Sequence, residues 1–143
     1  MKKLTKRSRE YIISFDILTK SISLDDLSKK IGINSSSGSR NKGQKNEFGK
    51  RNWTEKNTWF RLFSVLPKTS KLERHLDSII KRVEKSNVFR KGTLPKDNRL
   101  SICIAENYDF NERAYYQIDI PEKYVVWCGK HRVSLEVVAY PCS

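Results

Sequence analysis

Basic and aromatic side chains alternate in one glycine-containing stretch of the chain, from Gly38 to Trp59. The cations can bind phosphates or carboxylates, and exposed rings can stack on bases or pack against another protein. We therefore predict a partner-binding surface in this stretch and on the outer face of the Leu-rich segment 72–85. Its predicted residues are Arg40, Lys42, Lys45, Lys50, Arg51, Trp53, Lys56, Arg74, Lys81 and Arg82. The competing interpretation is structural: Trp53 and Trp59 would close the core, and the lysines would only keep a loop in water.

The same stretch lacks the composition of a nucleotide-binding loop. Gly38 and Gly43 have the spacing of the first two glycines of a phosphate-binding loop. Such a loop continues with Lys and then Ser or Thr, which contact the terminal phosphates and magnesium, and it opens a helix. Here Gln44 and Lys45 follow, and no helical pattern begins. We expect no nucleotide site.

Cysteine and histidine do not form the pattern of a metal site or a catalytic pair. Cys128 and His131 have the spacing of one half of a zinc site, but structural zinc usually needs two such pairs. Cys103 and Cys142 stand far from them in sequence, and no third group would orient Cys128 and His131 as nucleophile and base. His75 lies beside the apolar stripe of the Leu-rich segment, where a histidine is usually a packing residue. We expect no metal, no cofactor, no small-molecule substrate and no enzymatic activity.

The charge balance favours an acidic partner. The formal net charge is +13, from 29 Lys and Arg against 16 Asp and Glu. Residues 1–100 hold 25 basic and 10 acidic side chains, whereas residues 101–143 hold 4 basic and 6 acidic ones. A positive field of this kind attracts an acidic protein, a nucleic acid or an anionic membrane, and it also favours solubility without any partner.

Cysteine usage and hydropathy bear on location. Three widely spaced cysteines do not form a disulfide framework, which favours a reducing cytoplasm. The apolar run from Tyr11 to Leu18 is short and contains Asp16, so we expect no signal peptide. No apolar run approaches the roughly 20 residues of a membrane span. We predict a cytoplasmic protein that does not bind a membrane.

Apolar spacing in the first half predicts strands around a short helix. Tyr11–Leu18 alternates as a strand, and residues 24–32 have helical spacing, with Ser23 as the N-cap and a glycine at the end. Residues 34–57 are poor in apolar groups, so we expect a loop with at most one short strand. Residues 57–66 are nearly all apolar, which predicts a strand that is covered on both faces.

The second half predicts two further helices. Residues 72–84 carry Leu, Ile and Val on one stripe, which is typical of an amphipathic helix. Residues 100–104 alternate as a strand, and residues 116–118 suggest a further short one. Residues 120–129 fit a short helix that starts at Pro121 and ends at Gly129, although Val125 and Val126 also suit a strand; we favour the helix. A strand over residues 133–140 completes the chain.

This order of elements predicts an α+β fold, with a single antiparallel or mixed sheet and two to three helices packed mainly on one face. A ferredoxin-like topology is the expected arrangement of the strands. We predict one domain over residues 10–143, preceded by a disordered basic tail over residues 1–9.

Six segments follow one another in a characteristic order. They are Tyr11–Leu18, Leu24–Gly32, SRNKG at Ser39–Gly43, TWFRLFS at Thr58–Ser64, LERHLDSIIKRVE at Leu72–Glu84 and IPEKYVVWCGKHRVSLEVVAY at Ile120–Tyr140. This order resembles the bacterial family called domain of unknown function 4279, over about residues 10–140. The resemblance implies an α+β fold and carries no reaction or ligand.

The basic surface is the feature that suggests a function. We predict a small non-enzymatic binding protein that engages an acidic protein, in an inhibitor, immunity or defence-associated role. The alternative is an RNA- or DNA-binding protein that uses residues 38–56, although no RNA-recognition pattern, GXXG loop or zinc finger is present. The Lys- and Asn-rich composition suggests an AT-rich bacterium or phage.

Overall fold

The computed structural model describes residues 9–109 and 118–142 of the chain. Only Arg9 of the predicted tail is among them, so the tail otherwise lies outside the described residues. The predicted short strand over residues 116–118 also falls outside them, except for Ile118, which has no regular structure.

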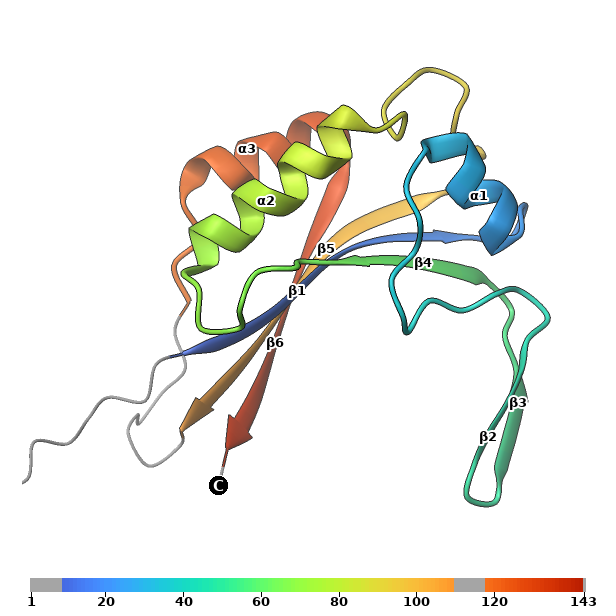
Figure 1. Ribbon diagram of the computed structural model, residues 1–143, viewed down its shortest axis with the longest axis horizontal. Helices are drawn as coiled ribbons and strands as arrows, with labels where there is room; N and C mark the ends of the chain where they lie inside the picture. The colour runs from blue at the N-terminus through green and yellow to red at the C-terminus, as the bar shows by residue number, and fades with distance from the viewer. Residues whose placement is uncertain (1–8, 110–117, 143) are drawn as a thin grey trace, which may run out of the picture.

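The described residues form an α+β fold, as predicted. In chain order the elements are β1 (Glu10–Thr19), α1 (Leu24–Ile31), β2 (Lys45–Phe48), β3 (Arg51–Thr54), β4 (Thr58–Phe63), α2 (Leu72–Lys85), β5 (Arg99–Asp109), α3 (Glu122–His131) and β6 (Val133–Cys142). The three helices lie on the same side of the main sheet (Figure 1). This arrangement confirms the prediction of helices packed mainly on one face.

The main sheet is mixed and has the strand order β4-β1-β5-β6. β1 is antiparallel to β4 and to β5, whereas β5 and β6 are parallel. The chain therefore makes one split β-α-β unit, in which α2 joins β4 to β5 across β1. It also makes one adjacent β-α-β unit, in which α3 joins β5 to β6. Because a ferredoxin-like fold is built from two split units, the ferredoxin-like topology is not confirmed.

The core lies between the helices and one face of the main sheet. Ile13, Phe15 and Ile17 alternate along β1 toward the helices and are almost completely buried. Leu76 and Ile79 of α2 are fully buried in the same cluster. The period-two pattern of the strand and the helical pattern of α2 thus bury matching apolar faces.

Strand β4 is buried on one face only, which corrects the prediction that both of its faces are covered. Phe60 and Leu62 point into the core, whereas Trp59, Arg61 and Phe63 alternate to the opposite face and are half-buried. No described helix lies on that side of the sheet (Figure 1). The nearly apolar run in the sequence therefore reflects aromatic rings on an uncovered face.

Local signals set the helix boundaries. Ser23 Oγ accepts a hydrogen bond from a first-turn N–H of α1, and Gly32 ends this helix at φ 77°, both as expected. Helix α3 runs past Gly129 to His131, which corrects the predicted stop. Gly129 does not adopt a positive φ, and Arg132 takes the left-handed C-cap position instead, at φ 55°.

Residues 34–57 contain two strands, which corrects the prediction of at most one. β2 and β3 form a separate antiparallel hairpin that turns at Gly49 and Lys50. Gly49 has φ 61°, and a glycine in the first position of a two-residue turn is a known hairpin signal. Hydrophobic alternation is missing from the sequence because the hairpin packs on no core, and every residue of β3 is exposed.

We expect Leu76→Ala to lower the free energy of unfolding by about 2–5 kcal/mol, because it leaves a cavity between α2 and the sheet. Urea denaturation followed by circular dichroism measures the change. Val65→Ala is the control, since 76% of Val65 is exposed and its truncation should cost less than about 0.5 kcal/mol. Equal effects of the two substitutions would contradict this placement of the core.

Candidate functional site

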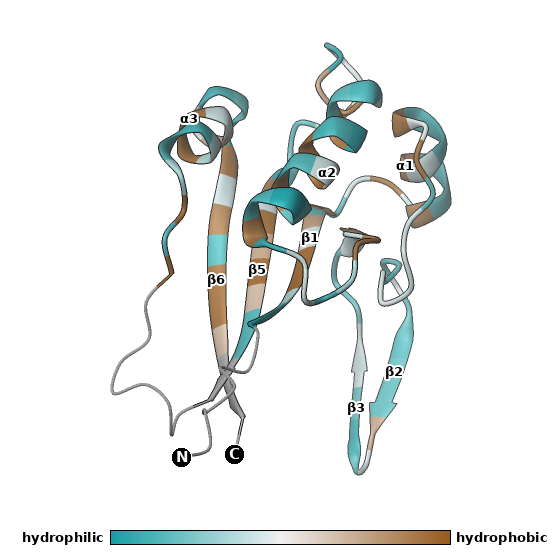
Figure 2. Cartoon of the chain, turned by 60° about the vertical axis from the view of Figure 1, so that its left-hand side comes forward, coloured by the Kyte–Doolittle hydropathy of each residue, from teal (hydrophilic) through white to brown (hydrophobic). Residues whose placement is uncertain are grey.

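The basic, aromatic stretch of the sequence forms an arm that projects from the body of the protein. Figures 1 and 2 show the β2–β3 hairpin, here called the hairpin arm (residues 45–54), extending away from the main sheet on the side opposite to α2. Lys45, Lys50 and Arg51 are exposed on it, and Phe48 is 78% exposed. Three cations and an aromatic ring therefore stand in solvent on one narrow element.

A single carboxylate fastens the base of the hairpin arm. Glu55 Oε1 accepts a hydrogen bond of 2.7 Å from Arg40 Nη1 and one of 2.7 Å from Asn46 Nδ2. The indole Nε1–H of Trp53 donates to the same oxygen at 3.0 Å. The donors come from the loop before the arm, from β2 and from β3, so the carboxylate joins three segments of the chain.

The same contacts keep Glu55 ionised. Burial by itself raises the pKa of the Glu55 carboxyl, but the three hydrogen bonds and the charge of Arg40 outweigh it and hold the pKa below its ordinary value of 4.5. Because the pKa is lowered in the folded state, the anchor stabilises the fold fully above about pH 4.5. Its contribution is lost as the pH falls through the lowered pKa.

Arginines and aromatic rings stack in alternation between the arm and β4. Arg40 Cζ lies 5.9 Å from the ring centre of Trp53 and 5.7 Å from that of Trp59. Arg61 Cζ lies 4.5 Å from the ring centre of Trp59 and 4.7 Å from that of Phe63. Such contacts contribute about 0.5–1 kcal/mol each at exposed sites. We call these five residues the cation–π ladder.

An acidic side chain of the neighbouring strand holds one end of the ladder. Arg61 lies opposite Asp16 in the β1–β4 pairing, and Arg61 Nε is 3.5 Å from Asp16 Oδ1. The two atoms form an ion pair without a hydrogen bond. Since Asp16 is only 5% exposed, its charge needs this cation, and Arg61 is committed to the chain's own carboxylate.

The loop before the arm closes the outer edge of β4. Arg40 and Trp59 exchange two backbone hydrogen bonds, of 2.9 and 2.7 Å. The Ser36 N–H donates to the Arg61 carbonyl at 2.8 Å, and the Ser36 hydroxyl accepts from the Phe63 N–H at 3.1 Å. A strand edge whose donors and acceptors are occupied offers no template for another strand. The same contacts fix the root of the arm to the sheet.

Half of the predicted partner-binding residues lie on or directly beside the arm. They are Lys45, Lys50, Arg51, Trp53 and Lys56. Two more lie at its base and contact their own chain: Arg40 bonds Glu55 and stacks in the ladder, and Lys42 Nζ donates to the Lys20 carbonyl at 2.9 Å. The cations that a partner can reach are therefore fewer than the sequence indicates.

The remaining three predicted residues belong to a different surface. Arg74 and Lys81 are exposed on α2, which lies across the main sheet from the arm (Figure 1). Arg82 is half-buried, and its Nη1 donates to the Phe63 carbonyl at 3.2 Å. The arm and α2 are thus separate basic surfaces, and one small contact cannot cover both.

Sequence reasoning missed three members of the site: Glu55, Arg61 and Phe63. For the last two a signal was present, since Trp59, Arg61 and Phe63 alternate along a strand and must share one face. Glu55 had no such signal, because two of its donors stand 15 and 9 positions away in sequence. Trp53 and Trp59 do not belong to the helix-side core, so the interpretation that they close it is wrong.

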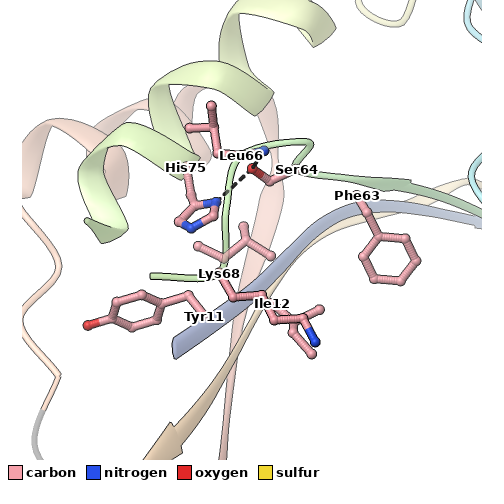
Figure 3. Close-up of a pocket in the computed structure, with 8 residues that line it drawn as sticks. Tyr11, Ile12, Phe63, Ser64, Leu66, Lys68 and His75 are labelled. Atoms are coloured by element: carbon pink, nitrogen blue, oxygen red, sulfur yellow. Dashed lines mark hydrogen bonds between the residues drawn. The ribbon is translucent and has the colours of Figure 1, made fainter. Parts of the chain in front are cut away.

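A concave region lies where β4 ends, shown in Figure 3. Its volume is about 230 Å³, and its lining includes Tyr11, Lys68, Ser64 and His75. Ser64 Oγ and His75 Nδ1 are 2.6 Å apart. A serine and a histidine can act as nucleophile and base when a third group orients the ring. No carboxylate is among the described residues that line this pocket, and we interpret the pair as a structural hydrogen bond.

Burial governs the protonation of this histidine. His75 is 1% exposed, and its burial lowers the pKa of the imidazole below its ordinary value of 6.5. The backbone carbonyls of Lys68 and Pro67 oppose this effect without reversing it. His75 is therefore neutral in the folded protein at neutral pH.

The residues considered for metal binding lie in packed surroundings. Cys128 is 3% exposed within the core, and the His131 ring stacks on Phe89 with ring centres 4.1 Å apart. Within the described ranges, no group of three or more His, Cys, Asp or Glu side chains could hold a metal ion. In the same ranges, no helix is both long enough and apolar enough to cross a membrane.

No protein-family model, curated protein or solved structure matches the chain. The resemblance to domain of unknown function 4279 therefore stays a prediction, and function has to be argued from the geometry of the chain itself.

Glu55→Gln should loosen the hairpin arm while the main sheet stays folded, because the charge-assisted hydrogen bonds at its base are lost. We expect amide hydrogen exchange over residues 45–54 to become about tenfold faster at neutral pH, which corresponds to about 1.4 kcal/mol. Glu47→Gln is the matched control, since it removes an exposed acid from the same hairpin. Unchanged exchange in Glu55→Gln, or equal acceleration in both, would show that this carboxylate is not the anchor.

The free energy of unfolding should fall as the pH drops below about 6.5. At such pH the His75 imidazole binds a proton in the unfolded chain, whereas in the folded protein its lowered pKa keeps it neutral. One such group gives a slope of at most about 1.4 kcal/mol per pH unit. Urea denaturation between about pH 7 and pH 5 measures it. In His75→Asn the slope should decrease, while His131→Gln, which keeps His75, should retain it. An unchanged slope in His75→Asn would refute the assignment.

Proposed function

We propose that the protein is a non-enzymatic, cytoplasmic binding protein that engages an acidic surface of a partner protein through the hairpin arm. One observation carries the proposal. The exposed ring of Phe48 lies opposite Arg51 and close to the turn residue Lys50, with Lys45 exposed at the other end of the same strand, on an arm whose base is fixed by Glu55.

The composition and rigidity of the arm suit protein recognition. Aromatic residues and arginine are the side chains most enriched at the energetic centres of protein interfaces. A surface hollow of about 410 Å³ is lined by Phe48, Arg51, Asn52 and Trp53, which is room for a partner's side chain beside a guanidinium group. Because the ladder and Glu55 hold the arm in place, little conformational freedom would be lost on binding.

The ladder argues against the nucleic-acid alternative. A protein that binds single strands offers successive aromatic faces on which bases stack. In this chain, guanidinium groups already lie over the rings of Trp53, Trp59 and Phe63. Of the two exposed rings of the arm, Trp53 already has Arg40 over it, so Phe48 is the ring without a stacked cation, and a single ring does not make a stacking platform.

An inhibitor or immunity role suits this picture, since it needs an anchored binding surface and no catalytic residues. The resemblance to domain of unknown function 4279 is part of the proposal and supplies no partner of its own. Steering by the net charge of +13 would speed encounter with an acidic target, and raised salt would weaken it.

The test compares two variants that each remove three cations. Lys45→Ser/Lys50→Ser/Arg51→Ser alters the arm, and Arg74→Ser/Lys81→Ser/Lys85→Ser alters α2 as the matched control. Partners are captured from the source cells and identified, and their affinity for each purified variant is then measured by calorimetry. We expect an acidic protein that binds the wild type and the control alike, and that binds the arm variant at least about 30-fold more weakly, equivalent to about 2 kcal/mol.

Two results would overturn the proposal. The first is equal affinity of the partner for the arm variant and the wild type. The second is retention of the wild type, and loss of the arm variant, on a mixed pool of single-stranded RNA and DNA at about 50 mM salt, with affinity falling steeply as salt rises. That outcome would assign the arm to nucleic acid.

A further inference from the structure

The two edge strands of the main sheet, β4 and β6, differ in the hydrogen bonding of their outward backbone groups. At β4, the loop over residues 36–40 occupies the outward donors and acceptors of Trp59 and Arg61. At the other edge, β6 pairs only with β5 among the described residues. From Val133 to Ala139, no described residue outside β5 makes a hydrogen bond to β6. Among the described residues, the chain itself closes the β4 edge and leaves the outward backbone groups of β6 without a hydrogen-bond partner from Val133 to Ala139.

The sequence of β6 does not protect this edge. Natural edge strands are blunted by lysines, by prolines, by bulges or by short length. β6 has ten residues with one charged side chain, Glu136, and its proline, Pro141, is next to its end. Figure 2 shows most of the strand in the colours of apolar residues. Glu136 is the only charge on this strand, and a long, mostly apolar edge is a template for pairing with another strand.

Exposed apolar side chains continue this edge. Val137 and Val138 on β6 are 40% and 37% exposed, and Val125 and Val126 on α3 are 50% and 60% exposed. Helix α3 lies next to the beginning of β6 in Figures 1 and 2. Four of the eight exposed large apolar side chains among the described residues therefore belong to these two consecutive elements, with Val137 and Val138 on opposite faces of the sheet.

Charge determines which occupant fits this surface. Two copies of a chain with a net charge of +13 repel each other over most of their surface. The positive excess lies in residues 1–100, whereas residues 101–143 hold 4 basic and 6 acidic side chains. β6 has no Lys or Arg. The strand therefore brings no cations of its own to a contact with a second copy, and the nearest ones in sequence, Lys130 and Arg132, precede its first residue.

We propose that β6 pairs with the β6 of a second copy, antiparallel and around a two-fold axis, so that the main sheets of both copies become one continuous sheet. The outward backbone groups of the two strands would hydrogen-bond each other, and Val137 and Val138 of each copy would become less exposed to water. This dimer does not depend on the proposed function of the arm.

The dimer has a geometrical consequence. Because β4 and β6 are opposite edges of the sheet, pairing through β6 places the two β4 edges, and with them the two hairpin arms, at the far ends of the assembly. Two arms on one particle would bind a repeated or dimeric target with increased avidity.

The test is the mass of the full chain in solution, measured by sedimentation velocity from about 1 to about 100 µM. We expect twice the monomer mass of 16.8 kDa at the upper end of this range. We also expect the dimer to strengthen as salt rises from about 50 to about 500 mM, because screening weakens the repulsion of like charges. Hydrogen exchange over residues 133–139 should slow as the dimer forms.

The variant Val138→Lys places cations on both sides of the two-fold axis and should weaken the dimer at least about tenfold, equivalent to about 1.4 kcal/mol. Val65→Lys is the matched control: it adds one lysine at a valine that is 76% exposed and remote from β6, and it should still dimerise. Thermal melts confirm that each variant is folded. If Val138→Lys does not fold, Val137→Lys takes its place.

Three results would overturn the proposal. One is a wild type that stays monomeric at every concentration and salt. Another is a dimer that Val138→Lys and Val137→Lys leave intact, since the interface would then lie elsewhere. The last is a dimer that salt dissociates, because such a dimer would be held by the basic surfaces and not by β6.

Discussion

Two backbone hydrogen bonds between Arg40 and Trp59 are the constraint on which the functional part of the structure depends. They attach the loop that precedes the hairpin to the outer edge of β4. This attachment closes the edge, brings Arg40 between two tryptophan rings, and sets its guanidinium group against Glu55. Without it, the hairpin would be a short two-stranded ribbon with no face to pack, and such ribbons are marginally stable in water.

The net charge of a chain overstates the charge that it offers to a partner. Arg40 and Arg61 are paired with Glu55 and Asp16 and stacked on rings. The carboxylates and rings offset the cost of desolvating these two guanidinium groups. Arg40 and Arg61 therefore hold the site together and are not available as charges for a partner. Lys50 and Arg51 lie at the turn of the hairpin and are exposed, and Lys45, at the base opposite Thr54, is exposed as well. The paired arginines and the exposed cations therefore have different roles, although they belong to one basic run.

Two kinds of surface lie at opposite edges of the main sheet. The β4 edge carries the hairpin arm with its positive charge, and the outward backbone groups of β4 are already hydrogen-bonded to the loop before the arm. The β6 edge has apolar side chains and almost no charge. Salt acts on the two in opposite directions, since it screens attraction between unlike charges and repulsion between like ones. A protein built in this way can present a charged surface to a target without obstructing association through its neutral edge.

The sequence by itself determined the elements that are amphipathic. The alternation of Ile13, Phe15 and Ile17, the stripe of α2 and the cap at Ser23 are local patterns, and each fixes which face is buried. The α+β class follows from their order. Only the tertiary structure decided the strand order, the hairpin and the pairing of Arg40 with Glu55. These depend on contacts between residues distant in sequence, and on a hairpin too exposed to have an apolar pattern. The tertiary structure also decided which cations have no carboxylate beside them, because a charge is neutralised by neighbours in space and not by neighbours in sequence.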